Sequence, residues 1–192
     1  TESDDLIYGT SGADVIDGLG GSDQIYGYES DDQLYGGAGG DVIFGGDGND
    51  HIDGGLDGDY LVGEAGSDNY WFAPGFGHDQ VMDYSIGAAQ DNNVIHLTGV
   101  APALLQVLRD DQHIYLGIRG TNDRISLLNW FVDPAVFAGS QWEGADWRTF
   151  NVQFDDGTTL GAAALDAAVE INFVFPLDRG NDLGQHLNRR QR

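Results

Sequence analysis

The sequence contains no cysteine and no lysine, and each absence excludes a class of site. Without cysteine the chain has neither disulfides nor thiolate-bound metals. A secreted fold would then need another stabilising cross-link, and a bound metal ion is the usual one. The lack of lysine excludes a P-loop, because that motif needs a lysine beside the phosphates. No run of about 18 apolar residues occurs, which excludes a transmembrane helix.

Positive charge is scarce as well. The chain has 8 basic residues, all of them arginine, against 32 acidic residues, and its net charge is −24. Such a surface repels a phosphate backbone, which excludes nucleic acid as a partner, and it repels itself unless counter-cations bind. Most of the acids are aspartate, which suits turns and is a short, hard oxygen ligand, and the 30 glycines also favour turns. The composition therefore indicates a turn-rich protein that binds cations.

The first third of the chain is a nine-residue repeat with three columns in phase. Aspartate fills one column, at Asp5, Asp14, Asp23, Asp32, Asp41, Asp50, Asp59 and Asp68. An apolar residue lies two positions after each aspartate, at Ile7, Ile16, Ile25, Leu34, Ile43, Ile52, Leu61 and Tyr70. Glycine lies five positions before each aspartate from Asp14 onward, at Gly9, Gly18, Gly27, Gly36, Gly45, Gly54 and Gly63. The absence of any insertion excludes a chance pattern.

Each repeat predicts one turn and one short strand. Residues 36–41 are typical of a six-residue turn, and residues 42–44 of a strand whose middle residue faces inward. Two repeats would form one coil of a stack, so that alternate repeats lie above each other. The fold class predicted is all-β, a stack of parallel strands with turns along both edges.

The stacking places the aspartates in two rows that need cations. Alternate repeats put Asp14, Asp32, Asp50 and Asp68 on one edge and Asp23, Asp41 and Asp59 on the other. After a two-residue slip the pattern returns at residues 74–81, so that Asp79 follows Asp59. Two carboxylates plus several turn carbonyls make a flexible, all-oxygen cage, which favours Ca²⁺ over Mg²⁺ or Zn²⁺. Counting neighbours along each edge predicts about six Ca²⁺ ions.

The repeat resembles the RTX (repeats-in-toxin) nonapeptide, G-G-x-G-x-D-x-U-x, most closely at residues 36–44 (GGAGGDVIF) and 45–53 (GGDGNDHID). The resemblance implies a parallel β-roll with Ca²⁺ between alternate turns, held by aspartates and backbone carbonyls. The turn glycines expected at these sites are Gly9, Gly18, Gly36, Gly37, Gly39, Gly45, Gly46, Gly48 and Gly54. The alternative interpretation is a disordered Gly/Asp-rich linker, which is the state that we expect without calcium.

Several repeats depart from the pattern. Leu19, Tyr28 and Glu64 replace the second glycine of a turn, and Ser30 and Asp57 replace the glycine at the fourth position. We therefore expect the turn around residues 28–30 to bind calcium weakly or irregularly.

From residue 94 glycine becomes rarer and a different pattern begins. Strands are predicted at 94–97, 104–109, 113–118, 124–128 and 150–154, with the middle three forming an antiparallel meander, and a helix at 160–171. Residues 76–83, 120–131 and 152–158 resemble the cap that follows the repeats in large RTX proteins, such as RTX adenylate-cyclase toxins. The core of this cap is predicted at Trp130, Phe131, Trp142, Trp147 and Phe150, although a ligand platform is an alternative role for these aromatics.

The predicted organisation is a calcium-binding β-roll at 1–83, a capping region at 84–172 and a tail at 173–192. The tail is either a solvated end or the type I secretion signal that the resemblance implies. Because the chain begins with Thr1 instead of Met, we expect it to be part of a longer protein.

No enzyme signature is present, and we expect no catalytic residues. The five histidines are scattered, and neither H-E-x-x-H nor G-x-S-x-G occurs. The resemblance implies a calcium-induced folding module of a type I secreted RTX protein, outside or on the surface of a Gram-negative bacterium, with calcium and the secretion machinery as partners.

Two alternatives remain open. One is a receptor- or glycan-binding module, suggested by the outward residues Tyr8, Tyr26, Tyr35 and Phe44, which do not form one even row. The other is a noncatalytic module of an RTX lipase, protease or alginate epimerase.

Overall fold

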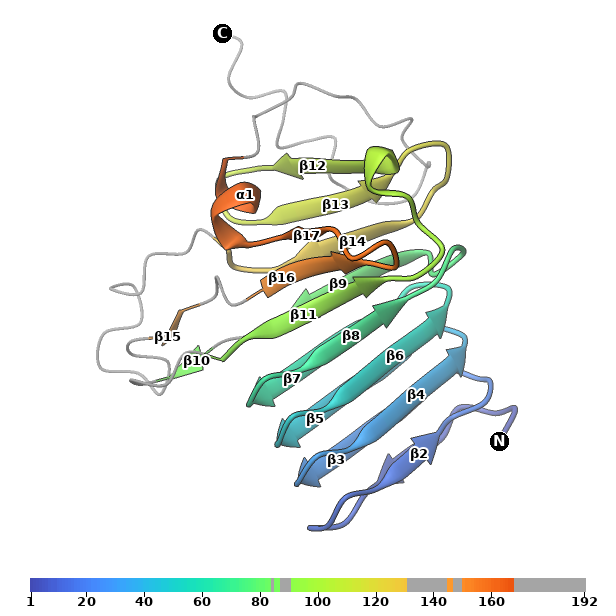
Figure 1. The fold of residues 1–192 in the computed structure, drawn as a ribbon. Coiled ribbons are helices and arrows are strands. Elements are labelled where there is room, and N and C mark those ends of the chain that lie inside the picture. Colours follow the sequence, from blue (N-terminus) through green and yellow to red (C-terminus); the bar gives the residue numbers. More distant parts are fainter. Residues whose placement is uncertain (84, 87–90, 131–144, 147–149, 168–192) are drawn as a thin grey trace, which may run out of the picture.

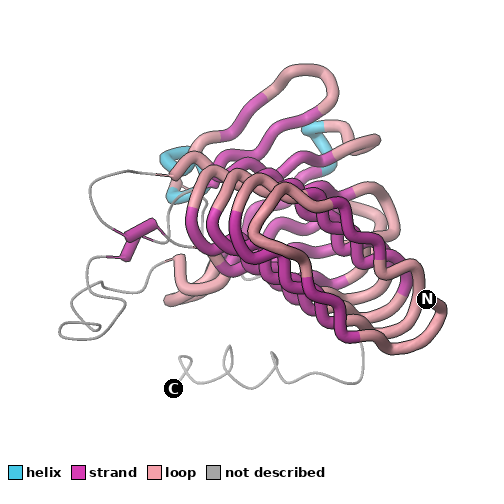
Figure 2. Tube along the Cα trace, turned by 90° about the horizontal axis from the view of Figure 1, so that it is seen from below, coloured by secondary structure: helices cyan, strands magenta, loops and turns pink. Residues whose placement is uncertain are grey.

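The computed structural model describes residues 1–83, 85–86, 91–130, 145–146 and 150–167. Its strands form two long sheets that face each other as a flattened coil, which Figure 2 shows nearly end-on. Figure 1 shows the strands stacked in order from β2 near the N-terminus to β12 at the opposite end.

One sheet contains β1 (Leu6–Tyr8), β3 (Gln24–Glu29), β5 (Val42–Asp47), β7 (Tyr60–Ala65), β9 (His78–Met82), β14 (Arg124–Leu127), β13 (Ile114–Ile118) and β12 (Leu105–Arg109), in this spatial order. The other contains β17 (Thr159–Leu160), β16 (Phe150–Phe154), β11 (Asn93–Leu97), β8 (Asn69–Phe72), β6 (His51–Leu56), β4 (Gln33–Ala38) and β2 (Val15–Asp17). A small pair joins β10 (Ser85–Ile86) to β15 (Ala145–Asp146).

The register confirms that two repeats form one coil. Ile25 of β3 pairs with Ile43 of β5, and Ile43 pairs with Leu61 of β7, in parallel strands. The opposite sheet repeats this spacing, with Leu34 of β4 beside Ile52 of β6. The all-β prediction and the parallel β-roll are therefore correct.

The apolar column forms the core of the roll. Ile25, Leu34, Ile43, Ile52 and Leu61 are all 0% exposed. Their neighbours along each strand face outward because side chains alternate across a strand. A single inward residue per strand fills the narrow space between the sheets.

The strands are longer than predicted. Residues 42–44 were expected as a three-residue strand, but β5 continues to Asp47. The extension is possible because the turn residues of successive coils pair with each other, as Gly37 does with Gly55 and as Gly46 of β5 does with Tyr28 and Glu64. Tyr28 and Glu64 keep the positive φ of the glycines at this place, so the ladder continues into the turn.

The capping region extends the sheets of the roll. The predicted antiparallel meander is present as β12, β13 and β14, and β14 pairs in parallel with β9. In the other sheet β11 pairs in parallel with both β8 and β16. Both sheets thus run across residue 83, and the predicted division of the chain there stays a prediction.

Two of the five aromatics predicted as the cap core are described, and both are buried. Trp130 is 2% exposed and Phe150 is 1% exposed, and their rings stack at 6.4 Å between centroids. Phe131, Trp142 and Trp147 lie outside the described residues, as does the predicted tail.

Two short helices accompany the cap. A 3₁₀-helix, η1 (Pro102–Leu104), takes up Leu104, which was predicted as strand. The helix expected at 160–171 is α1 (Ala162–Asp166) within the described residues, and 168–171 lie outside them. Neither helix is long and apolar enough to cross a membrane, nor is any other helix in the described part of the chain.

Candidate metal sites in the turns

Each aspartate row is bonded from coil to coil through one carboxylate oxygen. The backbone N–H of Asp23 donates to Oδ1 of Asp41 at 2.7 Å, and that of Asp41 donates to Oδ1 of Asp59 at 2.8 Å. The same bond joins the remaining predicted pairs, namely Asp14 to Asp32, Asp32 to Asp50, Asp50 to Asp68 and Asp59 to Asp79. The structure thus brings together all six pairs expected from the sequence.

The second oxygen of most of these carboxylates has no protein partner. Oδ2 is buried and accepts no hydrogen bond in Asp23, Asp32, Asp41, Asp50, Asp59 and Asp68. A buried carboxylate oxygen without a hydrogen-bond partner destabilises a fold by roughly several kcal/mol, so such atoms are rare in native folds. A row of them indicates a ligand outside the protein chain.

Asp14 differs from the other members of its row. Its Oδ2 accepts hydrogen bonds from the backbone N–H and the hydroxyl of Thr10, at 2.6 and 2.9 Å. The first turn is therefore closed by protein groups, whereas the later turns are not.

Burial raises the pKa of the carboxylates towards the centre and the capped end of the roll. Desolvation, opposed by the backbone hydrogen bond and reinforced by the neighbouring aspartate, raises the pKa of Asp50 to about 6 and that of Asp59 to about 7. The same causes raise the pKa of Asp68 to about 7 and that of Asp79 to about 8. Protein groups alone do not compensate these charges, and a divalent cation would.

The turns bring backbone carbonyls close to the next coil. Gly37 and Gly39 have φ values of +108° and +121°, which suit glycine. A Cβ at Gly39 would lie 1.9 Å from the carbonyl oxygen of Gly21, and one at Gly37 would lie 2.3 Å from that of Leu19. A side chain there would fill the space next to these oxygens.

The predicted glycines occupy three places in the turns. Gly46 and Gly48 adopt positive φ at the second and fourth places, as Gly37 and Gly39 do. The first place lies against the carboxylate of its own repeat, so that a Cβ there would come within 2.9 Å of Oδ2 at each of Gly9, Gly18, Gly36, Gly45 and Gly54.

The departures from the pattern keep the turn conformation. Leu19, Tyr28, Ser30, Asp57 and Glu64 all have φ between +74° and +84°. A left-handed conformation costs an L-residue about 1–2 kcal/mol, so the surrounding coils impose the turn on these residues. Weaker calcium binding around residues 28–30 stays a prediction.

The ligand set fits calcium. In the described part of the chain no cluster of three or more His, Cys, Asp or Glu side chains could hold a metal. Two carboxylates of neighbouring coils together with turn carbonyls give an oxygen-only set, which a large and flexibly coordinated cation such as Ca²⁺ prefers.

Sequence reasoning missed two polar side chains that lie where the aspartate rows meet the cap, and only the first of them continues a row. Asn93 Oδ1 accepts the backbone N–H of Asp68 at 2.7 Å, in the place of a further aspartate. Asp123 accepts the backbone N–H groups of Gly75 and Gly77 at 3.0 and 3.3 Å. Both are followed two residues later by a buried isoleucine, Ile95 or Ile125, which is the spacing of the repeat and could have revealed them.

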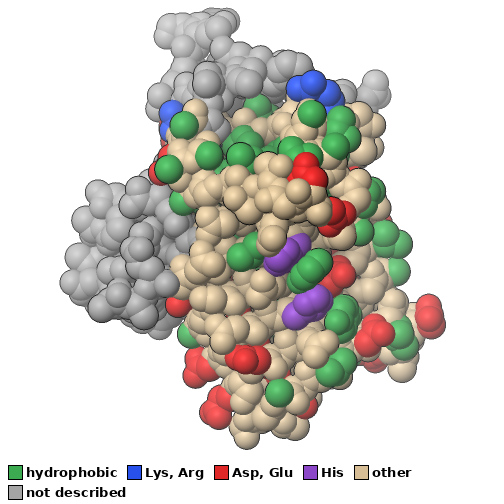
Figure 3. Space-filling view, viewed as in Figure 1, with side chains coloured by type: hydrophobic (Ala, Val, Ile, Leu, Met, Phe, Trp, Pro, Cys, Tyr) green, Lys and Arg blue, Asp and Glu red, His purple; other side chains and the backbone are tan. Residues whose placement is uncertain are grey.

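Aromatic rings line both outer faces of the roll. Tyr8, Tyr26 and Phe44 stack on one face, with centroids 5.4 and 5.1 Å apart. Tyr35 belongs to the opposite sheet, so the four outward residues do not form one row, as predicted. On that second face histidine and apolar side chains gather over β6, β8 and β11 (Figure 3), and Trp71 stacks on His96 at 4.0 Å.

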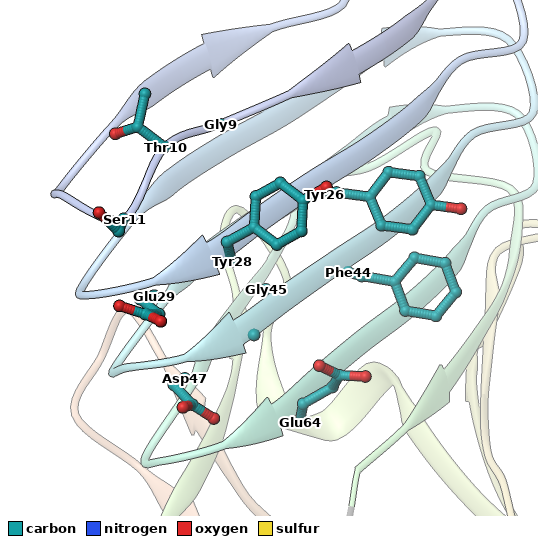
Figure 4. Close-up of a pocket in the computed structure, with 11 residues that line it drawn as sticks. Gly9, Thr10, Ser11, Tyr26, Tyr28, Glu29, Phe44, Gly45, Asp47 and Glu64 are labelled. Carbon is teal, nitrogen blue, oxygen red and sulfur yellow. The ribbon is translucent and has the colours of Figure 1, made fainter.

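A shallow hollow of about 650 Å³ lies beside the stack of Tyr8, Tyr26 and Phe44. Figure 4 shows aromatic rings gathered on one side of it and acidic side chains along the other. Its lining includes Tyr26, Tyr28, Phe44, Glu29, Asp47 and Glu64. We call these six residues the acidic-aromatic hollow.

Comparison with known proteins supports this interpretation of the turns. The family model described as the RTX calcium-binding nonapeptide repeat, in four copies, matches residues 1–34, 8–43 and 35–70. Among solved structures the chain is similar to the solution structure of the AlgE6R3 subunit from the Azotobacter vinelandii mannuronan C5-epimerase. The identity is 23%, the match covers 94% of this chain and 91% of that chain, and the TM-score is 0.38. No curated protein matches the chain.

Proposed function

Because residues 1–70 belong to the RTX calcium-binding nonapeptide repeat family, we propose that this chain is a calcium-induced folding module of a type I secreted bacterial protein. The repeats are calcium-binding, and the proposal concerns what binding does. In a cytosol poor in free calcium the acidic chain would remain unfolded. Outside the cell, millimolar calcium would fill sites with affinities near 10⁻⁴–10⁻³ M, a range typical of extracellular modules, and binding would drive folding.

The row of buried carboxylate oxygens without partners supports this proposal most strongly. Six such Oδ2 atoms are present along the two edges of the roll. Without a cation, the folded roll buries these charged carboxylates without solvation, which costs folding free energy. The metal-free roll is therefore unstable at neutral pH. A calcium ion between coils would turn the same carboxylates into the strongest contacts of the fold.

A calcium titration followed by far-UV circular dichroism tests the proposal. We expect a cooperative rise of β signal near millimolar Ca²⁺ and none with Mg²⁺, because Mg²⁺ demands a smaller, stricter octahedron. A chain that is already fully folded in chelator, and does not change on adding Ca²⁺, would contradict calcium-induced folding.

A second candidate function is glycan binding by the acidic-aromatic hollow. Aromatic rings provide apolar contact for sugar rings, and the acids Glu29, Asp47 and Glu64 would repel anionic sugars. The ligand favoured is therefore a neutral or amino-sugar polysaccharide.

A glycan array with calcium present tests this second function. Neutral or amino-sugar glycans should bind the chain, and Phe44→Ala should weaken binding, whereas Asp17→Asn on the opposite sheet should not. Binding confined to uronic acids, or no binding at all, would contradict it.

A further inference from the structure

The last coil of the roll contains an acidic residue that breaks the glycine pattern. In the register of β7 and β9, Val62 pairs with Met82, so Asp83 occupies the place that follows Gly63 by one coil. That place is glycine in the preceding coils, at Gly27, Gly45 and Gly63. A carboxylate thus enters the edge of the roll where every earlier coil has no side chain.

The side chain of Asp83 lies next to that of Asp68. Both residues are 0% exposed. A Cβ built on Gly63 would lie 2.2 Å from Oδ2 of Asp68, 2.4 Å from the hydroxyl oxygen of Tyr70 and 2.5 Å from Oδ2 of Asp83. Three side-chain oxygens therefore share one small space beside Gly63.

These three oxygens are not equivalent. The Tyr70 hydroxyl donates to Oδ2 of Asp83 at 2.6 Å and holds that carboxylate in place. Oδ2 of Asp68 is buried and accepts no hydrogen bond. Two buried carboxylates of like charge in one space repel each other strongly unless a cation or a proton lies between them.

The charge of the row explains why Asp83 is needed. Each earlier coil pairs two aspartates, but Asp68 is followed in its row by the neutral Asn93. At Gly45 the oxygens near the glycine are Oδ2 of Asp50 and the backbone carbonyl of Gly63, whereas at Gly63 the carboxylate of Asp83 is present instead. Asp83 therefore restores the second negative charge that Asn93 does not provide.

We propose that Asp68 and Asp83 bind a calcium ion at the junction between the roll and the cap, in a site built from side-chain carboxylates instead of a row of repeat aspartates. Tyr70 positions Asp83, and Asn93 positions the backbone of Asp68. The proposal rests on calcium loading of the repeats. It adds one ion beyond the six row pairs, and it links the end of the roll to β11 through Asn93.

Native mass spectrometry of the full chain in calcium tests the stoichiometry. Asp83→Asn should bind one ion fewer than the unmodified chain, while circular dichroism at saturating calcium still shows the roll. Asp110→Asn is the matched control, since it also removes a partly buried, hydrogen-bonded carboxylate from this end of the molecule but lies outside both aspartate rows, and it should bind the full number. An unchanged ion count in Asp83→Asn would overturn the proposal, and an unmodified chain that binds no calcium would instead overturn the proposed function.

A second variant covers the case in which Asp83→Asn does not fold. Asn93→Asp keeps the acceptor for Asp68 and adds a third carboxylate beside the site. If a cation lies there, this variant should fold at a several-fold lower calcium concentration. If the two carboxylates share a proton instead, the extra buried charge should raise the calcium concentration needed, which would overturn the proposal.

Discussion

At the scale of single residues, the two oxygens of the repeat aspartates from Asp23 to Asp68 have separate roles. Oδ1 accepts a backbone N–H from the preceding coil, as Asp59 does from Asp41 at 2.8 Å, while Oδ2 faces the turn without a partner. An asparagine would keep the first role and lose the charge of the second. Substitution by asparagine therefore separates structural from metal-binding contributions.

We expect Asp59→Asn to have opposite effects with and without calcium. With calcium, the variant should need a several-fold higher calcium concentration to fold, because one charged ligand is lost from two neighbouring pairs. In chelator it should be at least as stable as the unmodified chain, since a buried charge is removed. Calcium titrations and urea unfolding monitored by circular dichroism measure both effects, and destabilisation of equal size under both conditions would contradict the prediction.

Some turn residues with positive φ are not glycine, and replacing one of them with glycine should stabilise the turn. Leu19 has φ of +75° and a side chain that is 53% exposed, so Leu19→Gly removes strain and little packing. We expect the calcium-loaded chain to gain up to about 1 kcal/mol in free energy of unfolding. Val15→Gly, at an exposed site in the extended strand β2, should lose stability under the same urea denaturation. A loss in both variants would show that the turn at Leu19 is not strained.

At the scale of elements, the aspartate rows make the metal-free roll sensitive to pH. The pKa values of Asp50, Asp59, Asp68 and Asp79 are raised from 3.8 to about 6, 7, 7 and 8 by burial. A raised carboxylate pKa means that the folded state binds protons more tightly than the unfolded state. Its stabilising effect is complete below about pH 4 and is lost as the pH rises through about 6–8.

In chelator we therefore expect the β signal of the roll to increase on acidification from pH 8 to pH 5. The measurement is far-UV circular dichroism in chelator, with calcium-saturated protein as the control that should change little. A β signal in chelator that falls on acidification over this range would contradict the raised pKa values.

The meander of the cap should respond to pH in the opposite direction. Burial lowers the pKa of His113 below 6.5, and its Nδ1 accepts the backbone N–H of Asn129 at 2.9 Å. Protonation would remove this acceptor. The stability that neutral His113 contributes is present above pH 6.5 and is lost as the pH falls through the lowered pKa.

Tryptophan fluorescence in calcium measures this effect, because Trp130 follows the meander directly and is buried. We expect the urea midpoint of the fluorescence change to fall between pH 7 and pH 5, and His113→Gln to reduce this dependence. A midpoint with the same pH dependence in both proteins would assign the effect to other groups.

At the scale of the whole molecule, the roll and the cap share both sheets. β9 pairs with β14 and β8 pairs with β11, so removing the cap exposes two sheet edges and the end of the apolar column. Open edges and an uncovered core are costly in repeat proteins, which need their ends capped. The cap is thus positioned to start the ordering of the roll.

We expect a chain truncated after residue 90 to show no cooperative calcium-induced folding. The comparison is the full chain under the same calcium titration by circular dichroism, with truncation after residue 167 as a control that retains the described cap. Complete folding of residues 1–90 alone would contradict a nucleating role for the cap.

Much of the roll follows from the sequence because its contacts are periodic. A fixed spacing between Asp41, Ile43 and the next glycine sets the turn, the inward side chain and the stacking of alternate repeats, since every coil meets a copy of itself. The same period predicted that five of the aspartate pairs would meet, and the return of the pattern after the two-residue slip predicted the sixth, Asp59 with Asp79. Asn93 and Asp123 were missed because they lie outside the continuous period, although their spacing to an isoleucine follows it.

Tertiary structure decided what happens where the period ends. The placement of Asp83 beside Asp68 depends on a two-residue slip and on the parallel register of β7 and β9, which no local pattern specifies. The meander joins the sheet of the roll because β9 pairs with β14, and these two strands are far apart in the chain. Local repeats determine their own neighbours, whereas contacts between unlike segments arise only when the whole chain packs.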